Sequence, residues 1–278
     1  MKTAHNAGQA LVLVLLSLAV VLTLVLFILS RTITDIAVST TEEEAIRAFS
    51  AAEAGVEKAL IIGSVGETSI GDASFTADVS EFAEGLSAFN YPITLSPGDT
   101  ATIWFAENDG EGNLTPSFTG GAMKVCWGED ATPIDNNTPA VEISVFYDSG
   151  TVLIGRSALD PNASGRSLSN SFTPVATRDC TIDGVAYEFW SDVDLDALTQ
   201  GNTAGLLFAR VRMLYNADKR QSVGFDVTGE GLLPSQGQMI VSTGQSGDAN
   251  RRLEVFQGWG EPPPIFDSAV FSATGLTK

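Results

Sequence analysis

Apolar and polar positions divide this chain into a long helical part and a part with strand-like alternation. Residues 10–30 contain no charged side chain and are mostly Leu, Val and Ala, which matches the roughly 20 residues that a helix needs to cross a bilayer. The run is longer than the apolar core of about 7–15 residues in a cleaved secretory signal, and no A-x-A-type site follows it. It therefore predicts a retained transmembrane helix over about 10–30.

The helical pattern continues beyond the apolar run. No proline interrupts the chain between residues 31 and 62, and the first glycine there is Gly55. Small and apolar residues recur three and four positions apart, which is typical of one buried helix face. We therefore expect one helix over 9–62, roughly 80 Å long at 1.5 Å per residue, with a first half suited to lipid and a second half suited to packing on a folded domain. The predicted buried stripe is Ala45, Phe49, Ala52, Val56 and Ala59.

From residue 63 the pattern changes to alternation with a period of two. The stretch 141–147 places Val, Ile, Val and Tyr at every second position, which marks a strand with one buried face. Short polar stretches at 148–150 and 216–220 each predict a loop that joins a pair of strands. The other predicted strands are 74–79, 101–106, 122–127, 185–190, 206–215, 222–227, 238–243 and 251–257.

Together these elements predict an α+β fold in which the long helix packs on a mainly antiparallel β domain over 63–278. We expect this domain to divide near residue 190, into an irregular part at 65–190 and a meander at 191–260 that packs on the second half of the helix. The C-terminal residues, with three prolines in a row at 262–264, are expected to form an ordered extended tail.

Charge and cysteine content narrow the class of protein. The formal net charge of the chain is -19, and the residues from 36 onward sum to -20 because residues 1–35 contribute +1. Without a Lys/Arg cluster, so acidic a body repels phosphate backbones, which excludes a nucleic-acid partner. The two cysteines, Cys126 and Cys180, are expected to pair in a chain that leaves the cytoplasm; two unrelated buried thiols are the alternative.

The residues around the apolar run resemble a known family. A short polar head with Lys2 ends at Gly8, the apolar stretch follows, and "RAFSAAEAGVEKAL" begins at Arg47. This combination resembles the N-terminus of type IV pilin-like proteins, and most closely that of minor pilins with a PilX-type N-terminal region. The resemblance covers about the first 60 residues. Its helix signature is Ala48, Phe49, Ala51, Ala52, Glu53 and Ala54.

The resemblance implies a leader over 1–8, cut after Gly8 by a prepilin peptidase so that Gln9 becomes the N-terminus. Leu13 departs from the family pattern, because major pilins have at this position a glutamate that pairs with a neighbouring subunit's N-terminal amine. A carboxylate would be expensive in lipid, and its absence favours a minor, priming or tip role. The departure also leaves cleavage open: Gly8 as an ordinary glycine at the edge of an anchor is the alternative.

The implied partners are other pilin subunits, bound through the N-terminal helix, the prepilin peptidase and membrane lipid. We expect a single-pass membrane protein with a cytoplasmic N-terminus and an extracellular body, which is extracellular also in an assembled filament. Two alternative functions stay open: a pseudopilin of a type II secretion or competence system, and an unprocessed membrane-anchored surface receptor or adhesin.

Candidate chemistry is sparse. The single histidine, His5, lies in the predicted leader, so Ser-His-Asp, Cys-His and the usual zinc arrangements are excluded from the mature chain. We predict no enzymatic activity and no cofactor.

One acidic stretch has the spacing of a calcium loop. Asp192, Asp194 and Asp196 lie at alternate positions, as in an EF-hand, but Ala197 and Thr203 stand where that loop needs Gly and Glu. An acidic turn that caps a short helix over 195–198 is the favoured interpretation. Three Asn-x-Ser/Thr sites are expected to mark surface loops: Asn113, Asn136 and Asn162.

Overall fold

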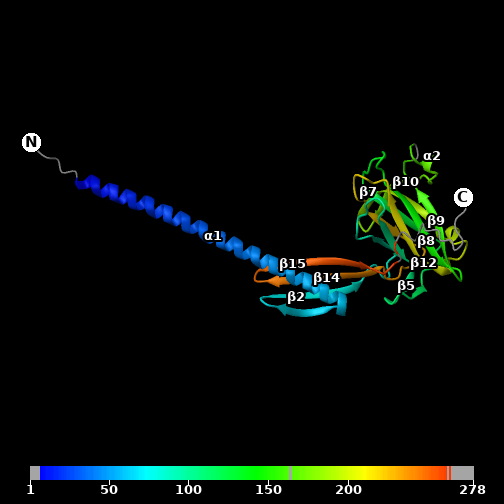
Figure 1. Cartoon of the computed structure of the whole chain (residues 1–278). Helices are drawn as coiled ribbons and strands as arrows, with labels where there is room; N and C mark the ends of the chain where they lie inside the picture. The colour runs from blue at the N-terminus through cyan, green and yellow to red at the C-terminus, as the bar shows by residue number, and fades with distance from the viewer. Residues whose placement is uncertain (1–6, 163–164, 262, 264–278) are drawn as a thin grey trace, which may run out of the picture. The chain divides into compact units, whose positions relative to one another are not determined.

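The computed structural model describes residues 7–162, 165–261 and 263, with the backbone alone at 7–10, 167 and 168. The chain divides into two compact units. The helix unit consists of the residues up to Val79 and of Ile240–Val255, and the sandwich unit consists of Ser80–Met239 and the residues from Phe256 on. One long helix and mainly antiparallel strands make this an α+β protein, as the sequence pattern predicted (Figure 1).

A single helix, α1 (Ala7–Ile62), begins the helix unit. Its 56 residues correspond to a length of about 84 Å at 1.5 Å per residue. The chain leaves the helix at Gly63, which has a φ of +79° and donates its N–H to the carbonyl of Ala59 at 2.9 Å. Glycine adopts this left-handed conformation without a steric penalty and therefore ends helices readily. The observed helix ends where the sequence pattern predicted.

The second half of α1 packs on a four-stranded sheet of the order β1-β2-β14-β15 (Figure 1). β1 pairs antiparallel with β2, with a register shift between Val65 and Thr68. The strands are β1 (Val65–Ile70), β2 (Ala73–Glu81), β14 (Gly237–Ser246) and β15 (Ala249–Gly258). The buried core between helix and sheet contains Ala51, Val56, Ala59, Val65, Ala73, Phe75, Ala77 and Ile240.

Two antiparallel sheets enclose the core of the sandwich unit. That core contains Val125 and Trp127 from one sheet and Ile143 and Val211 from the other. The first sheet, in the order β10-β11-β7-β13-β3, consists of β3 (Ala88–Asn90), β7 (Ala122–Glu129), β10 (Ala176–Ile182), β11 (Val185–Asp194) and β13 (Val223–Asp226). The second, in the order β4-β12-β8-β9, consists of β4 (Thr100–Trp104), β8 (Ala140–Asp148), β9 (Val152–Leu159) and β12 (Leu206–Leu214).

Strand alternation gives the second sheet an inner and an outer face. On β12, Ala209 and Val211 belong to the core between the sheets, whereas Phe208 belongs to a separate cluster on the outer face. β8 and β9 pair antiparallel around the predicted turn at 148–150. Smaller elements complete the unit: β5 (Ala106–Asn108), β6 (Leu114–Pro116), α2 (Ser167–Asn170), α3 (Leu195–Leu198) and a 3-10 turn, η1 (Thr203–Gly205).

The structure corrects three expectations about the β part. The chain does not divide near residue 190, because Trp190 lies inside β11 and pairs with Cys126 of β7. Residues 191–260 do not form one meander under the helix, since only 240–255 of them belong to the helix unit. Residues 216–220 connect β12 to β13, which lie in different sheets, and so do not close a hairpin. Alternation identifies a strand but not its partner, which is set by contacts distant in the sequence.

Candidate functional site

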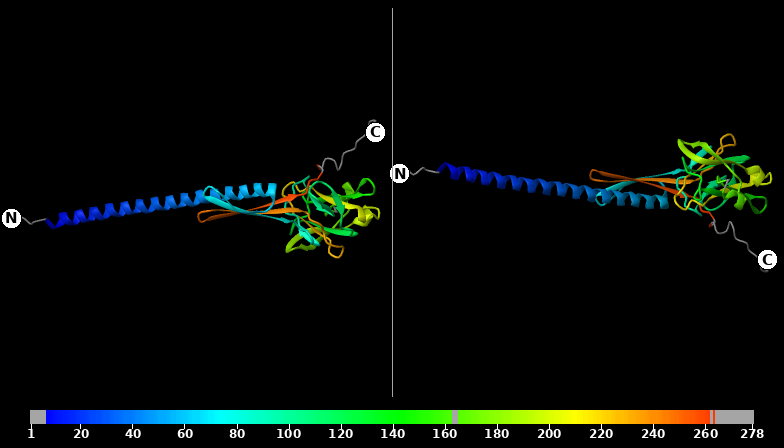
Figure 2. Two further views of the ribbon diagram at one scale, coloured as in Figure 1. Left: turned by 90° about the horizontal axis from the view of Figure 1, so that it is seen from below. Right: turned by 90° about the horizontal axis from the view of Figure 1, so that it is seen from above.

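The first half of α1 is apolar around its whole circumference. All side chains from Leu11 to Leu29 are exposed, and none of them is charged. Ser17 and Thr23 donate their hydroxyls to carbonyls of the same helix, three and four residues back, at 2.9 and 2.8 Å. Neither view in Figure 2 shows a strand of the helix unit beside this half. The segment is long and apolar enough to cross a membrane. A helix pairs its backbone N–H and C=O groups with one another, as is required in lipid, where no water can bind them.

The signature residues of the second half divide between two faces of α1. Three of the alanines are buried on the side that faces the sheet, whereas Phe49 is 42 % exposed and Glu53 is exposed. Of the predicted stripe, Ala52, Val56 and Ala59 are buried as expected and Ala45 is half-buried, whereas Phe49 is a correction to it. The helix presents small residues to the sheet and leaves its phenylalanine outside. The buried signature residues are Ala48, Ala51 and Ala52, and Ala54 is half-buried.

Two glycines let the helix and the sheet approach at backbone distance. A Cβ added to Gly244 of β14 would lie 2.0 Å from the carbonyl oxygen of Ala48 and 2.5 Å from the amide nitrogen of Ala52. A Cβ added to Gly55 of α1 would lie 2.2 Å from the hydroxyl oxygen of Ser242. Real Cβ atoms do not occupy such positions, so the backbone contact at Gly244 requires glycine, whereas at Gly55 the side chains of Ser242 and Phe75 would have to move. These contacts fix the rotation of α1 about its axis and therefore decide which face stays exposed.

The exposed face of this half combines apolar and charged residues. A shallow groove in the helix unit is lined by Ile46 and Ala54 of α1 and by Ile70 of β1. Arg47 borders it, paired with Glu43 one turn earlier in the favourable i, i+4 arrangement. This face, unlike the alanine face, is available to a partner.

The predicted processing site lies at the beginning of α1. The backbone of Gly8 and Gln9 is helical, and residues 1–6 of the predicted leader lie outside the described part of the chain. Leu13 is exposed among other apolar side chains of the helix. No carboxylate is therefore presented at the position where major pilins have one.

The sandwich unit contains the expected disulfide. Cys126 of β7 and Cys180 of β10 are bonded, with Cα atoms 6.3 Å apart. Just before Cys180 the β10–β11 register shifts, and Arg178 and Asp179 both have a φ of 64°. Such a bulge bends the strand, and here it allows β10 to approach β7 although β11 lies between them in the sheet order.

A buried tyrosine holds the same hairpin in place. Tyr187 of β11 donates its hydroxyl to the side-chain carbonyl of Asn90 at 2.7 Å, and Asn90 donates its amide to the carbonyl of Ile182 at 2.9 Å. Burial raises the pKa of Tyr187 to about 12. The phenol stays neutral at physiological pH and serves as a hydrogen-bond donor. These contacts and the disulfide hold the β10–β11 hairpin against β3 and β7.

The acidic stretch after β11 caps a helix. Asp194 accepts a hydrogen bond from the backbone N–H of Ala197 at 2.8 Å and is the N-cap of α3. The N–H groups of Leu195 and Asp196 donate to the carbonyl of Gly121 at 2.8 and 3.1 Å. The predicted capping turn over 195–198 is thus confirmed, and the side chain of Asp194 is used as a cap. Among the described residues no group of three or more His, Cys, Asp and Glu side chains is arranged to hold a metal.

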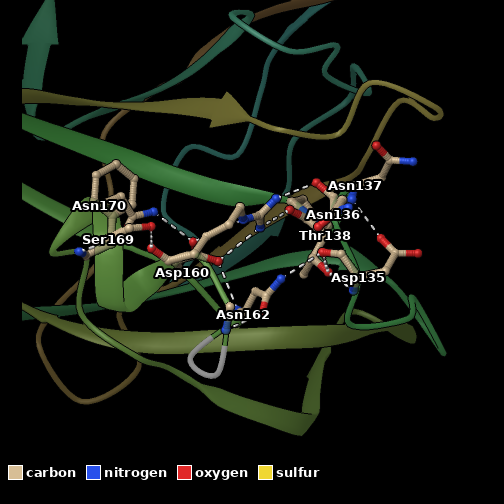
Figure 3. A network of polar contacts seen from close by, with 12 residues as sticks. Asp135, Asn136, Asn137, Thr138, Asp160, Asn162, Ser169 and Asn170 are labelled. Atoms are coloured by element: carbon tan, nitrogen blue, oxygen red, sulfur yellow. Dashed lines mark hydrogen bonds and ion pairs between the residues drawn. The ribbon is translucent and has the colours of Figure 1, made fainter.

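A buried polar network joins two loops of the sandwich unit (Figure 3). The carboxylate of Asp160 is fully buried and pairs with Arg166 at 3.0 Å. Arg166 also donates to the carbonyls of Asn136 and Thr138, both at 2.6 Å. Asn162, only 7 % exposed, donates its amide to the carbonyl of Asp135 at 2.9 Å. The expectation that Asn162 marks a surface loop is therefore wrong for this side chain, which is part of the network.

Neither the polar network nor the glycine contacts were predicted from the sequence. The network joins 135–138 to 160–170, and the Asp and Asn residues of both stretches were the only signal for it. Gly244 breaks the alternation of a strand, which often marks a close backbone approach. No family model matches the chain, and neither the curated proteins nor the solved structures include a significant match.

Proposed function

We propose that this chain is a minor pilin or pilus-assembly subunit of a type IV pilus-like filament. It acts by association, without catalysis: its helix bundles with the helices of other subunits, and its β domain is displayed outside the cell. Before assembly the chain is a single-pass membrane protein with its N-terminus in the cytoplasm. The alternative within the same class is a pseudopilin of a type II secretion or competence system.

The observation that carries this proposal is the contrast between the two halves of one continuous helix. The second half is fixed on its own sheet through Gly55 and Gly244. The first half extends from the same rod, and its apolar side chains from Leu11 to Leu29 are uncovered by the described part of the chain. Because apolar surface must be removed from water, lipid or other helices have to cover it. The helix of a filament subunit lies first in lipid, while the subunit is a membrane protein, and later among the helices of other subunits.

The short segment after the apolar run supports helix partners in addition to lipid. Arg31 and Asp35 place charges just beyond the apolar run, yet Ile33, Ile36 and Val38 remain exposed on α1 before the sheet begins. A plain membrane stalk in water would have no use for these apolar side chains. Partner helices would cover them.

Leu13 supports a minor role. In the family that the N-terminus resembles, a carboxylate at this position pairs with the N-terminal amine of a neighbour. Leu13 cannot form this ion pair, so the pair would not fix the position of this chain relative to its neighbour, as it does for a major subunit. A subunit at the tip or in a priming complex does not need that contact.

N-terminal sequencing of the full chain, extracted from membranes of the producing cell, tests the proposal. We expect the chain to begin at Gln9, and a Gly8→Val variant to keep its leader and begin at Met1. Ala4→Val, inside the leader, is the matched control and should be cut like the wild type. A wild-type chain that begins at Met1 would contradict processing as a pilin and favour an unprocessed anchored receptor or adhesin.

A further inference from the structure

One edge of the sheet β4-β12-β8-β9 is closed by the chain itself. β4 is the first strand of this sheet, and the side chain of Gln236 lies along its outer edge. The amide of Gln236 accepts the N–H of Trp104 at 2.7 Å and donates to the carbonyl of Trp104 at 2.9 Å. Gln236 is only 2 % exposed. A buried side chain therefore replaces the missing strand at this edge, and a covered edge does not pair with other chains.

The opposite edge, β9, is covered at its C-terminal end. The carbonyl of Ala158 accepts the N–H of Thr173 at 2.8 Å, so Ala158 points away from β8. Because the hydrogen-bonding direction alternates along a strand, the N–H and C=O groups of Val152, Ile154 and Arg156 also point away from β8. Within the described part of the chain these groups have no hydrogen-bond partner. The first half of β9 is therefore an open edge.

The open part of β9 lacks the features that discourage pairing with another chain. Charges, prolines and bulges protect the edge strands of natural proteins. Residues 149–159 contain no proline and one charge, that of Arg156, and β8 and β9 pair without a register shift. Val152, Leu153 and Ile154 are 60 %, 41 % and 39 % exposed. The chain closes one edge of this sheet and leaves the other open and apolar.

We propose that β9 pairs antiparallel with β9 of a second copy of this chain, about a two-fold axis at Leu153. The strand is complementary to itself in this register, because Val152 of each copy lies opposite Ile154 of the other. These residues point to the shared edge, so each such pair exchanges both N–H···O bonds. The two Leu153 residues form the central non-hydrogen-bonded pair. A two-fold contact of this kind is closed and joins two copies.

The charges around β9 favour the same register. Arg156 of each copy lies opposite Gly150 of the other, and the carboxylate of Asp148 accepts the N–H of that glycine at 2.8 Å. The cation of one copy therefore approaches an acidic loop of the other. A register two residues further along would instead place Arg156 opposite Val152. Because Arg156 also pairs with Glu142 of its own β8 at 3.3 Å, the apolar contact is the main determinant and the charge is an addition.

Disulfide trapping of the full chain in detergent tests the proposal. In a Leu153→Cys variant the two new thiols lie at the two-fold axis. The Cα atoms of a non-hydrogen-bonded pair are about 4.5 Å apart, which is within the range that a disulfide spans. On mild oxidation by oxygen and copper phenanthroline we expect the covalent dimer as the main product on a non-reducing gel. Peptide mapping should find the new thiols linked to each other and the Cys126–Cys180 disulfide intact, which shows that the variant is folded.

Two further variants separate this contact from other kinds of association. Leu232→Cys, in the same unit and 65 % exposed, should stay monomeric because Leu232 is not part of β9. Ile154→Lys, added to Leu153→Cys, should remove the dimer because it places a charge in the apolar pair at the edge. Copies that associate through α1 alone would link the two cysteine variants equally.

A different pattern overturns the proposal. A Leu153→Cys variant that stays monomeric, equal dimer yields for Leu153→Cys and Leu232→Cys, or a dimer that Ile154→Lys leaves unchanged would each show that β9 does not pair with itself.

Hydrogen exchange of the wild-type chain is a second measurement, which no substitution disturbs. The amides of Val152 and Ile154 should exchange more slowly as the protein concentration is raised, because pairing protects them. Exchange that does not depend on concentration would contradict the proposal. None of these results depends on processing at Gly8, so the inference can fail without affecting the proposed function.

Discussion

Replacing Gly244 by alanine should detach the second half of α1 from its sheet. The new Cβ would lie 2.0 Å from the carbonyl oxygen of Ala48 and 2.5 Å from the amide nitrogen of Ala52. Both atoms belong to the helix backbone and cannot move alone, so α1 must shift away by more than an ångström. Overpacking of this kind costs about 1–3 kcal/mol. At about 2 kcal/mol, helix amides that exchange by local opening would exchange about 30-fold faster.

Hydrogen exchange of the full chain in detergent, followed by mass spectrometry, measures this effect on the amides of 48–59. Gly66→Ala is the matched control, because Gly66 lies in the same unit and an added Cβ meets nothing within 4 Å. Its effect should stay within about 0.5 kcal/mol, as for other exposed sites. Equal exchange in the Gly244→Ala and Gly66→Ala variants would refute the argument that backbone contact at Gly244 holds the helix.

Three further changes test the sandwich unit. Arg166→Met leaves the fully buried carboxylate of Asp160 without its charge partner, so urea unfolding followed by tryptophan fluorescence should show a loss of about 3–5 kcal/mol; a loss no greater than for an exposed arginine would refute the role of the network. Reduction of the Cys126–Cys180 disulfide, 54 residues apart in sequence, should lower stability by about 4 kcal/mol in the chain-entropy model, and an unchanged melting temperature would contradict it. Burial raises the pKa of Tyr187 from 10.0 to about 12, and because the unfolded phenol ionises first, stability should fall as pH rises from about 10 to 12. Tyr187→Phe should remove this part of the decline, and an ultraviolet titration in which every tyrosine ionises near pH 10 would oppose it.

Local pattern was enough to predict the helix and most of the strands. The apolar run and the absence of proline define α1 as far as Ile62, because helix formation depends on neighbours three and four residues apart. The alternation in β8 and the turn at 148–150 define a hairpin, since both strands and their loop are contiguous. The cap of α3 at Asp194 was predicted for the same reason.

Features that depend on distant parts of the chain were not predictable in this way. The face of α1 that is buried is set by Gly244, almost 200 residues after Ala48, so the predicted stripe was right at Ala52, Val56 and Ala59 but wrongly included Phe49. The division into two units depends on 240–255 returning to the helix. Nothing in the sequence around Arg166 or Asp160 indicates that the two side chains form an ion pair with a buried carboxylate.

Filaments sheared from the surface of the producing cell provide the most direct test of the central claim, that the first half of α1 lies among the helices of other subunits. Our account predicts that the chain is recovered in the sheared filament fraction, beginning at Gln9, in amounts well below those of the main subunit. A chain that is absent from the filaments and found only in the membrane, with its leader uncut, would contradict it.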